Sequence, residues 1–206
     1  MLKKELYPIV VAMALVVVAS NILVQFVVGN WLTYGAFTYP FAFLITDLTN
    51  RFYGKRAAQK VVLMGFLIGI ICSFIGSQII GEYGPLVTQR IAIASALAFF
   101  IAQSIDVAIF DKLRSTIWWK APLASSFIGA AIDTLVFFVV AFSMTLQFIE
   151  PSNDISWAIE KVNLLGIGPE LPFWVSLALA DFGIKLCLVC FSLFPFRWFI
   201  GSRQFL

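Results

Sequence analysis

The sequence predicts an all-α integral membrane protein with six transmembrane helices and both termini in the cytoplasm. Three observations carry this prediction. First, 61% of the 206 residues are hydrophobic, 12% are charged and the mean hydropathy is +0.97, whereas an average soluble domain is about half apolar and about a quarter charged. Second, apolar runs long enough to cross a bilayer recur along the chain. Third, positive charges gather in alternate connections.

The first three expected spans cover residues 6–29, 33–51 and 59–81. The first is too long for the apolar part of a signal peptide and lacks a convincing cleavage site. The second is the least regular, because Pro40 removes a helix hydrogen bond and is expected to expose a carbonyl or kink the chain. A stripe of small residues on the third favours close packing inside the monomer, with a seam between two copies as the alternative. The stripe consists of Gly65, Gly69, Ser73 and Ser77.

The last three expected spans cover residues 87–110, 122–148 and 172–196. An outer loop at residues 150–171 separates the last two, and it is the longest polar interruption. We expect a plain connector there, with an amphipathic surface helix near its middle as the alternative. Because hydrophobic runs otherwise follow one another closely, residues 1–206 are predicted to form a single membrane domain.

Orientation follows from the lysines and arginines, because cytoplasmic connections carry the excess of them. Six spans place both termini on one side of the membrane, and eleven cations fall on that side. The opposite side holds only Lys161, together with several acidic residues, so both termini are expected in the cytoplasm. The eleven cations are Lys3, Lys4, Arg51, Lys55, Arg56, Lys60, Lys112, Arg114, Lys120, Arg197 and Arg203.

Several functional classes find no support in the sequence. A net charge of +3 without a basic arm does not indicate nucleic-acid binding. The chain has no histidine, and its three cysteines lie inside apolar runs, so no metal or haem centre and no other cofactor is expected. It also lacks the Gly-x-x-x-x-Gly-Lys-Ser/Thr loop that nucleotide-hydrolysing proteins use.

Three charged residues are predicted near the membrane midplane, where an ionised side chain costs at least a few kcal/mol. Asp133 falls near the middle of the fifth span, while Asp181 and Lys185 lie one turn apart in the sixth. One lysine paired with one aspartate would be a structural ion pair. Two carboxylates for one ammonium instead leave a carboxylate that must be protonated or await a donor-rich ligand, which favours a solute site.

Other polar residues in the spans have a structural alternative beside the functional one. Toward the outside, Asn21 and Gln25 are expected to line the solute path, and Arg90 either lines it too or reaches the lipid headgroups. Toward the cytoplasm, Asp47 pairs with Arg51 at helical spacing. Either this end pair is an anchor, or Asp47 contacts solute with Gln103 and Asp106 of the fourth span.

Aromatic residues around Pro40 precede the carboxylate of Asp47. Broken helices of this kind often carry the binding sites of transporters, although many membrane prolines are only kinks. Aromatic rings beside a carboxylate suit a planar, nitrogen-rich solute, because the rings stack on it and the carboxylate accepts paired N–H bonds.

At these residues the sequence resembles the queuosine precursor transporters, also called the vitamin uptake transporter family. The resemblance extends over nearly the whole chain, with Asp181 and Lys185 matching the family's final motif. The other matching segments are SNILVQ at residues 20–25, YGAFTYPF at 34–41 with TDLT at 46–49, RIA at 90–92 leading to Gln103 and Asp106, WW with AP at 118–122, and residues 125–134.

The resemblance implies a six-span importer in the bacterial inner membrane that takes up 7-cyano-7-deazaguanine, with the 7-aminomethyl form as an alternative, for tRNA queuosine salvage. A carboxylate such as Asp133 or Asp181 would then accept from the ring N–H and exocyclic amine, while Lys185, Asn21 or Gln25 would donate to the carbonyl oxygen.

A secondary transporter is the main functional hypothesis. The alternative is a membrane subunit that captures the solute for a separate energising complex, and a homo-oligomer is compatible with either. An enzyme acting on a lipid-soluble substrate is disfavoured, because no nucleophile and base stand together in the sequence.

Overall fold

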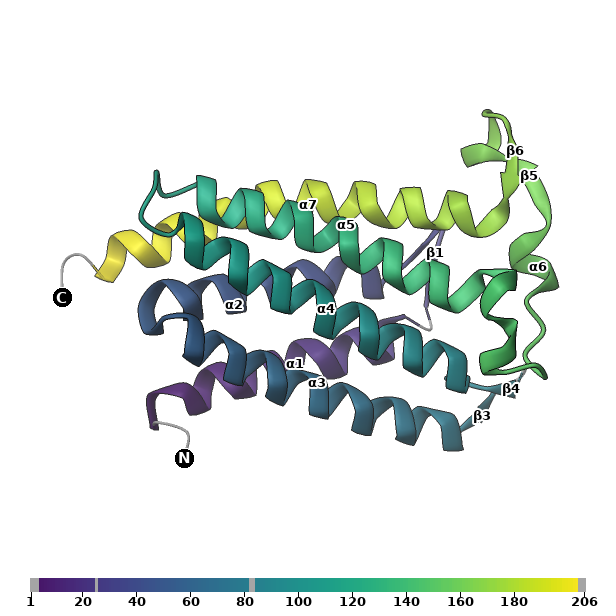
Figure 1. The fold of residues 1–206 in the computed structure, drawn as a ribbon, viewed down its shortest axis with the longest axis horizontal. Helices are drawn as coiled ribbons and strands as arrows, with labels where there is room; N and C mark the ends of the chain where they lie inside the picture. Colours follow the sequence, from purple (N-terminus) through teal and green to yellow (C-terminus); the bar gives the residue numbers. More distant parts are fainter. Residues whose placement is uncertain (1–3, 25, 82–83, 204–206) are drawn as a thin grey trace.

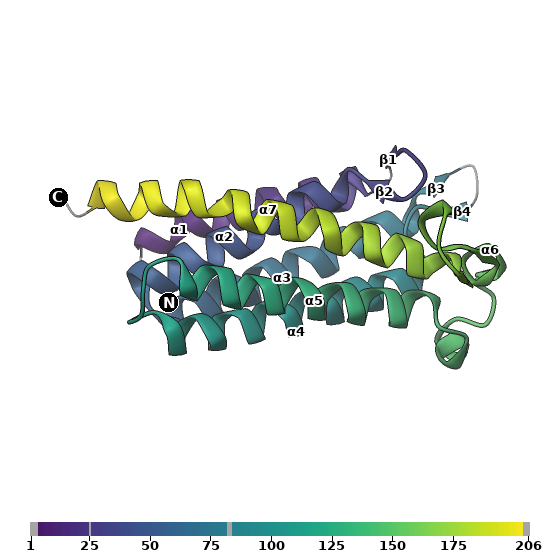
Figure 2. The ribbon, with the colours of Figure 1, turned by 90° about the horizontal axis from the view of Figure 1, so that it is seen from above.

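The computed structural model describes residues 4–24, 26–81 and 84–203. Its long helices run side by side along one axis (Figures 1 and 2). In this described part the bundle contains α1 (Tyr7–Leu23), α2 (Gly35–Tyr53), α3 (Lys55–Gln78), α4 (Gln89–Leu113), α5 (Lys120–Phe142) and α7 (Phe173–Arg203). A 3-10 turn, η1 (Lys4–Leu6), precedes α1.

Five helical segments of the described chain are long and apolar enough to cross a membrane. They are Lys4–Leu23, Lys55–Gln78, Gln89–Leu113, Lys120–Phe142 and Phe173–Gly201. The protein is therefore an all-helical, multi-pass membrane protein with five candidate spans. Helix α2 falls outside this set, although its 19 residues have sufficient length.

The polar side chains of α2 explain its lower hydropathy, and its position explains how they are tolerated. Thr46, Asp47, Thr49 and Asn50 are all buried. Helix α2 contacts α1, α3, α4, α5 and α7, so most of its surface faces protein. Buried polar groups find hydrogen-bond partners there that lipid would not supply. Helix α2 continues through Pro40, from Gly35 to Tyr53, so the helix is not interrupted at this residue.

Short elements connect the helices at one end of the bundle (Figure 1). The hairpin of β1 (Val27–Val28) and β2 (Leu32–Thr33) joins α1 to α2, and that of β3 (Ile80–Gly81) and β4 (Gly84–Pro85) joins α3 to α4. Helix α1 thus ends at Leu23, before the end at residue 29 that hydropathy suggested. We call this end of the bundle the hairpin end.

The long connection between α5 and α7 is folded rather than plain. Helix α5 ends at Phe142, where η2 (Met144–Ile149) begins a different path, so the predicted span to residue 148 is too long. The connection then forms α6 (Ser156–Ile159), β5 (Lys161–Asn163), η3 (Leu164–Gly166) and β6 (Glu170–Pro172), with β5 and β6 antiparallel. The alternative was an amphipathic surface helix, and only the four residues of α6 adopt an α-helix in this connection.

Small residues let the helices approach closely. A Cβ at Gly65 would lie 2.9 Å from Cγ of Met13 and 3.1 Å from Cζ of Phe99, so α3 packs against α1 and α4 at this glycine. Ser73, two turns further along, is also buried. Part of the small-residue stripe therefore serves packing within one chain.

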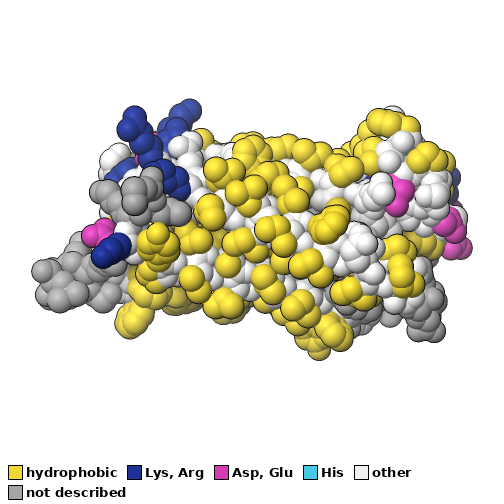
Figure 3. All heavy atoms as spheres, turned by 90° about the horizontal axis from the view of Figure 1, so that it is seen from below, with side chains coloured by type: hydrophobic (Ala, Val, Ile, Leu, Met, Phe, Trp, Pro, Cys, Tyr) yellow, Lys and Arg dark blue, Asp and Glu magenta, His cyan; other side chains and the backbone are white. Residues whose placement is uncertain are grey.

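The surface has the character of a membrane protein. On the face drawn in Figure 3, hydrophobic side chains cover the middle of the molecule. The Lys and Arg side chains visible on this face gather mainly at the end opposite the hairpins. Large apolar residues such as Leu15, Phe74 and Leu135 are at least 65% exposed in the isolated chain. Lipid contact removes the cost of such exposure.

Candidate functional site

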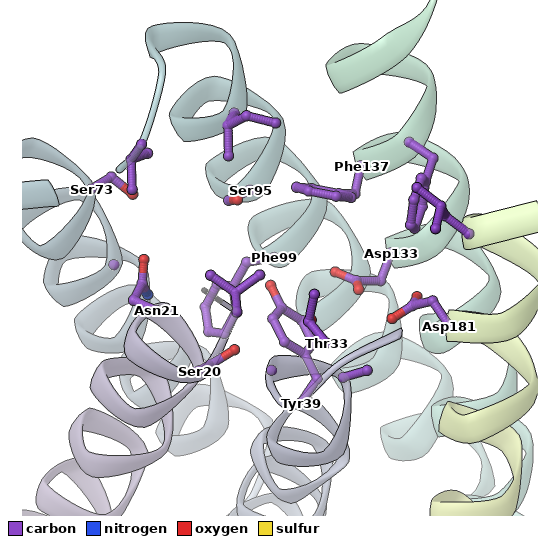
Figure 4. Close-up of a pocket in the computed structure, with 18 of the residues that line it drawn as sticks. Ser20, Asn21, Thr33, Tyr39, Ser73, Ser95, Phe99, Asp133, Phe137 and Asp181 are labelled. Carbon is purple, nitrogen blue, oxygen red and sulfur yellow. The ribbon is translucent and has the colours of Figure 1, made fainter. Parts of the chain in front are cut away.

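A cavity of about 530 Å³ lies inside the bundle and reaches the hairpin end. All six bundle helices line it, and Trp31, Leu32 and Trp157 belong to the lining near the hairpins. Its wall is mainly apolar, with a few polar side chains that point inward (Figure 4). Small-molecule sites have this size and composition, because apolar walls exclude water while a few polar groups fix orientation.

Lys185 connects two carboxylates in the cavity wall. Its Nζ lies 2.7 Å from Oδ2 of Asp133 and 2.5 Å from Oδ2 of Asp181. The Thr134 hydroxyl donates to Asp181 Oδ2 at 2.7 Å and lies 3.2 Å from Nζ. Lys185 and Asp133 are only 4% and 2% exposed. The three charged residues predicted from spacing thus form one buried group, contributed by α5 and α7.

The charge of this group is unbalanced. One ammonium faces two carboxyl groups, and Oδ1 of Asp133 is buried without a well-formed hydrogen bond among the described residues, although the Tyr39 hydroxyl lies close to this carboxyl group. An unpaired acceptor in a low-dielectric wall is costly, whether it is a carboxylate or a neutral carboxyl oxygen. A ligand with N–H donors would relieve that cost, so the site is suited to a donor-rich solute.

Tyr39 of α2 completes the group. Its hydroxyl points toward Asp133 (Figure 4), and Lys185 Nζ lies 5.1 Å from the centre of its ring. The ring also packs edge-on against Phe99, with centroids 6.2 Å apart. Phe99 and Phe137 line the same cavity. Aromatic faces beside a carboxylate allow a flat ring to stack while its N–H groups are bound.

Asn21 also lines the cavity, and its side-chain orientation is set locally. Its Nδ2 donates to the carbonyl of Val17 at 2.9 Å. Gln25, predicted beside it, lies outside the described residues. Ser73 of α3 and Ser95 of α4 line the cavity as well. The sequence interpretation missed these serines and Tyr39 as site residues; only the aromatic cluster around Pro40 gave a signal for the tyrosine.

Arg90 lies apart from the cavity lining and is fully buried. Its guanidinium donates to the carbonyls of Val140 and Ser143 and to Oε1 of Gln147 at 2.5–2.7 Å. Its backbone N–H donates to Glu150 at 2.9 Å. Arg90 thereby fixes the end of α5 and the turn η2 against α4. These bonds satisfy the carbonyls that the end of α5 leaves free.

Asp47, Gln103 and Asp106 also lie outside the cavity lining, and they form a separate polar cluster. Asp47 accepts from Ser125 and Ser126 of α5, and Asp106 accepts from Ser126. Gln103 Oε1 accepts from Thr46 at 2.8 Å. The expected Asp47–Arg51 pair is wrong, because Arg51 donates instead to the carbonyl of Arg114.

Comparisons of the sequence with known proteins find one family model and several named relatives. Residues 33–200 match a family model described as "Putative vitamin uptake transporter". The chain is 39% identical over 142 residues to the "Queuosine precursor transporter" of Escherichia coli (strain K12), covering 62% of this chain and 64% of that protein. It is 36% identical over 137 residues to the "Probable queuosine precursor transporter" of Haemophilus influenzae (strain ATCC 51907 / DSM 11121 / KW20 / Rd), covering 61% and 57%.

A similar protein from Bacillus subtilis (strain 168), also named "Probable queuosine precursor transporter", is 27% identical over 132 residues, covering 55% of this chain and 58% of that protein. The chain thus matches less than two thirds of the length of each of these relatives. No solved structure matches it significantly.

Proposed function

Because the chain belongs to the vitamin uptake transporter family, we propose that it imports a queuosine precursor base across the bacterial inner membrane as a secondary transporter. The proposed solute is 7-cyano-7-deazaguanine, with the 7-aminomethyl form as the alternative. The names of the relatives support this solute class, and the donor-seeking group in the cavity supports a flat base rich in N–H donors.

The proposed topology has six spans, which are the five candidate spans and α2. The described chain starts and ends at the same end of the bundle (Figure 1), which an even number of crossings explains. The basic end faces the cytoplasm in this proposal, because Lys55, Arg56 and Lys60 at the start of α3 lie there. The cavity then reaches the outer side, as expected for an importer before it releases its solute.

The proposed site rests mainly on the buried carboxyl group of Asp133. Its unpartnered Oδ1 can accept from the ring N–H or the exocyclic amine of a guanine-like base. The Lys185 ammonium donates to a carbonyl oxygen of the base by giving up its longest contact, the one to Thr134 at 3.2 Å. Asn21 contributes its amide from the opposite helix, and Tyr39 and Phe99 provide stacking faces.

Uptake in cells tests the function. Bacteria that lack both their own importer and the ability to make the base are given labelled 7-cyano-7-deazaguanine, with and without this chain. Uptake and the return of queuosine in tRNA are expected only when the chain is present. Equal, background uptake in both strains, with the protein shown to be in the membrane, would contradict the proposal. Transport by the purified chain alone in liposomes would exclude a need for a separate energising complex.

A further inference from the structure

Asp47 and Asp106 form a second buried carboxyl pair, separate from the cavity. They are 2% and 0% exposed. The Ser126 hydroxyl lies between them, 3.2 Å from Oδ2 of Asp47 and 3.4 Å from Oδ1 of Asp106, while Ser125 lies 3.3 Å from Oδ1 of Asp47. Because the same hydroxyl contacts both, the two carboxyl groups are near neighbours. Three helices, α2, α4 and α5, therefore meet at this pair.

No cation balances the pair among the described residues. On α2, Arg51 is turned away to Arg114, and on α5 the facing groups are the two serine hydroxyls. Lys55, Arg56 and Lys60 of the adjacent α3 are exposed. On α7, Asp181 and Lys185 belong to the cavity group. Two ionised carboxylates facing each other in an apolar interior repel strongly, so such a pair retains a proton.

Several buried polar atoms around the pair lack hydrogen-bond partners among the described residues. Oδ2 of Asp106 has no hydrogen-bond partner among the described residues, and neither has Oδ1 of Asn50 one turn along α2. Gln103, one turn before Asp106, has an unpartnered Nε2. All three side chains are fully buried. Static buried networks normally satisfy such atoms, and each exception calls for an explanation, such as a functional role. A proton fits, since every nearby group is an oxygen or an amide.

Two helices, α2 and α5, connect the pair to the cavity, and the distance along each helix is the same. Tyr39 and Asp47 are eight residues apart on α2, and Asp133 and Ser125 are eight apart on α5. At about 1.5 Å per residue, both intervals correspond to about 12 Å. The buried ring of Phe43 lies midway on α2 and packs on Gly129, midway on α5, where a Cβ would come within 2.7 Å of it. Phe43 therefore separates the cavity from the pair.

We propose that Asp47 and Asp106 hold one exchangeable proton, and that its exchange beyond the Phe43 ring couples solute movement to the proton gradient. This inference rests on the proposed transport of a base. The singly protonated pair, in which a neutral carboxyl faces a carboxylate, stabilises the contact of α2, α4 and α5 that closes the path below the cavity. Loss of the proton leaves two charges that repel, which separates these helices and moves Phe43 away from Gly129. One proton then crosses with each uncharged base.

The test uses the full chain, purified and reconstituted into liposomes with the membrane potential clamped at zero. Labelled 7-cyano-7-deazaguanine is followed in two ways, by exchange against internal unlabelled base and by net accumulation under an imposed gradient. With one proton per neutral base, an inward gradient of one pH unit supports up to about tenfold accumulation. A sodium gradient of the same size is expected to support none.

Substitutions at the carboxyl pair test whether it holds the exchanged proton. The substitutions Asp47→Asn and Asp106→Asn mimic a permanently protonated carboxyl, so each is expected to exchange base but to accumulate none under the pH gradient. Asp111→Asn, at a half-buried carboxylate five residues after Asp106 on α4 that pairs with Arg114, is the matched control and keeps the full accumulation. Ser126→Ala is a milder variant that leaves both carboxyls in place; it is expected to shift the pH at which accumulation is half-maximal.

The outcomes separate the two proposals. Exchange by the wild-type chain without any accumulation under the pH gradient overturns proton coupling and leaves base transport intact. Accumulation driven by sodium, or full accumulation in both asparagine variants, also overturns the assignment. Absence of exchange in the wild-type chain contradicts transport of this base, and the coupling falls with it. If either asparagine variant fails to fold, the other and Ser126→Ala still decide the question.

Discussion

The Nζ of Lys185 lies 2.7 Å from Oδ2 of Asp133, which ties α7 to α5 inside the cavity wall. The same ammonium also holds Asp181, one turn away on its own helix. Because both carboxyl groups depend on one cation, any change at Lys185 alters the electrostatics of the entire group. The ion pair therefore links the stability of the bundle to the site proposed for the base.

We expect Lys185→Gln to destabilise the protein by about 3 to 5 kcal/mol, the usual effect of removing one partner from a buried ion pair. The double variant Lys185→Gln with Asp133→Asn should lose less than the sum of the two single variants, because it leaves one carboxylate, Asp181, without a cation instead of two. Thermal unfolding in detergent measures both. Lys161→Gln, at an exposed lysine, is the control, and purely additive losses would argue against the pair.

Two substitutions at Tyr39 separate its hydroxyl from its ring. Tyr39→Phe removes the group that points toward Asp133 but keeps the ring beside Lys185. We expect a loss of affinity for the base of less than about tenfold, as for one hydrogen bond. Tyr39→Leu also removes the stacking face and should weaken binding further. Competition binding with unlabelled base measures both variants, and equal losses would show that the ring does not contact the solute.

Gly129→Ala tests the close contact below the cavity. The added methyl would lie 2.7 Å from the Phe43 ring, so Phe43 must move or the helices must separate. Overpacking of this kind costs about 1 to 3 kcal/mol, and we expect a lower unfolding temperature together with slower base exchange. Gly183→Ala is the matched control, because a Cβ there meets nothing within 4 Å. A fully stable, fully active Gly129→Ala protein would contradict the described packing.

Labelling of single cysteines tests the proposed topology. In a variant whose three native cysteines are replaced, Lys161→Cys between α5 and α7 should react with an impermeant maleimide in intact cells. Lys55→Cys at the start of α3 should react only after the membrane is permeabilised. Both lysines are exposed, so accessibility of the side chain does not limit either reaction. Labelling of Lys55→Cys in intact cells would reverse the orientation.

The charged group in the cavity wall could be predicted from the sequence, because the rise of a helix converts position in a span into depth in the membrane. Asp133, Asp181 and Lys185 were expected at one depth, and the structure brings them into contact. Family membership was likewise predicted from motifs and is confirmed by the match over residues 33–200. Local spacing and ordered motifs are properties of the chain itself, which is why they can be read without coordinates.

Contacts between different helices were not accessible in the same way. Sequence spacing paired Asp47 with Arg51, whereas the fold turns Asp47 toward α4 and α5. Arg90 looked like a residue of the solute path or the lipid interface, yet it binds the end of α5 and η2. Both outcomes depend on which faces of distant helices meet, and a hydropathy pattern does not contain that information. The hairpin that ends α1 early was missed because its first strand, Val27–Val28, and the residue before it, Phe26, are as apolar as a span.

Equilibrium binding of labelled 7-cyano-7-deazaguanine to the purified protein tests the proposed site most directly. The wild-type chain and the control Asp111→Asn should bind the base with the same affinity. Asp133→Asn should bind at least about tenfold more weakly, since the amide replaces a hydrogen-bonding carboxyl group that contributes more than about 1.4 kcal/mol. Unchanged binding by a folded Asp133→Asn protein would contradict the assignment of Asp133 as the residue that recognises the base.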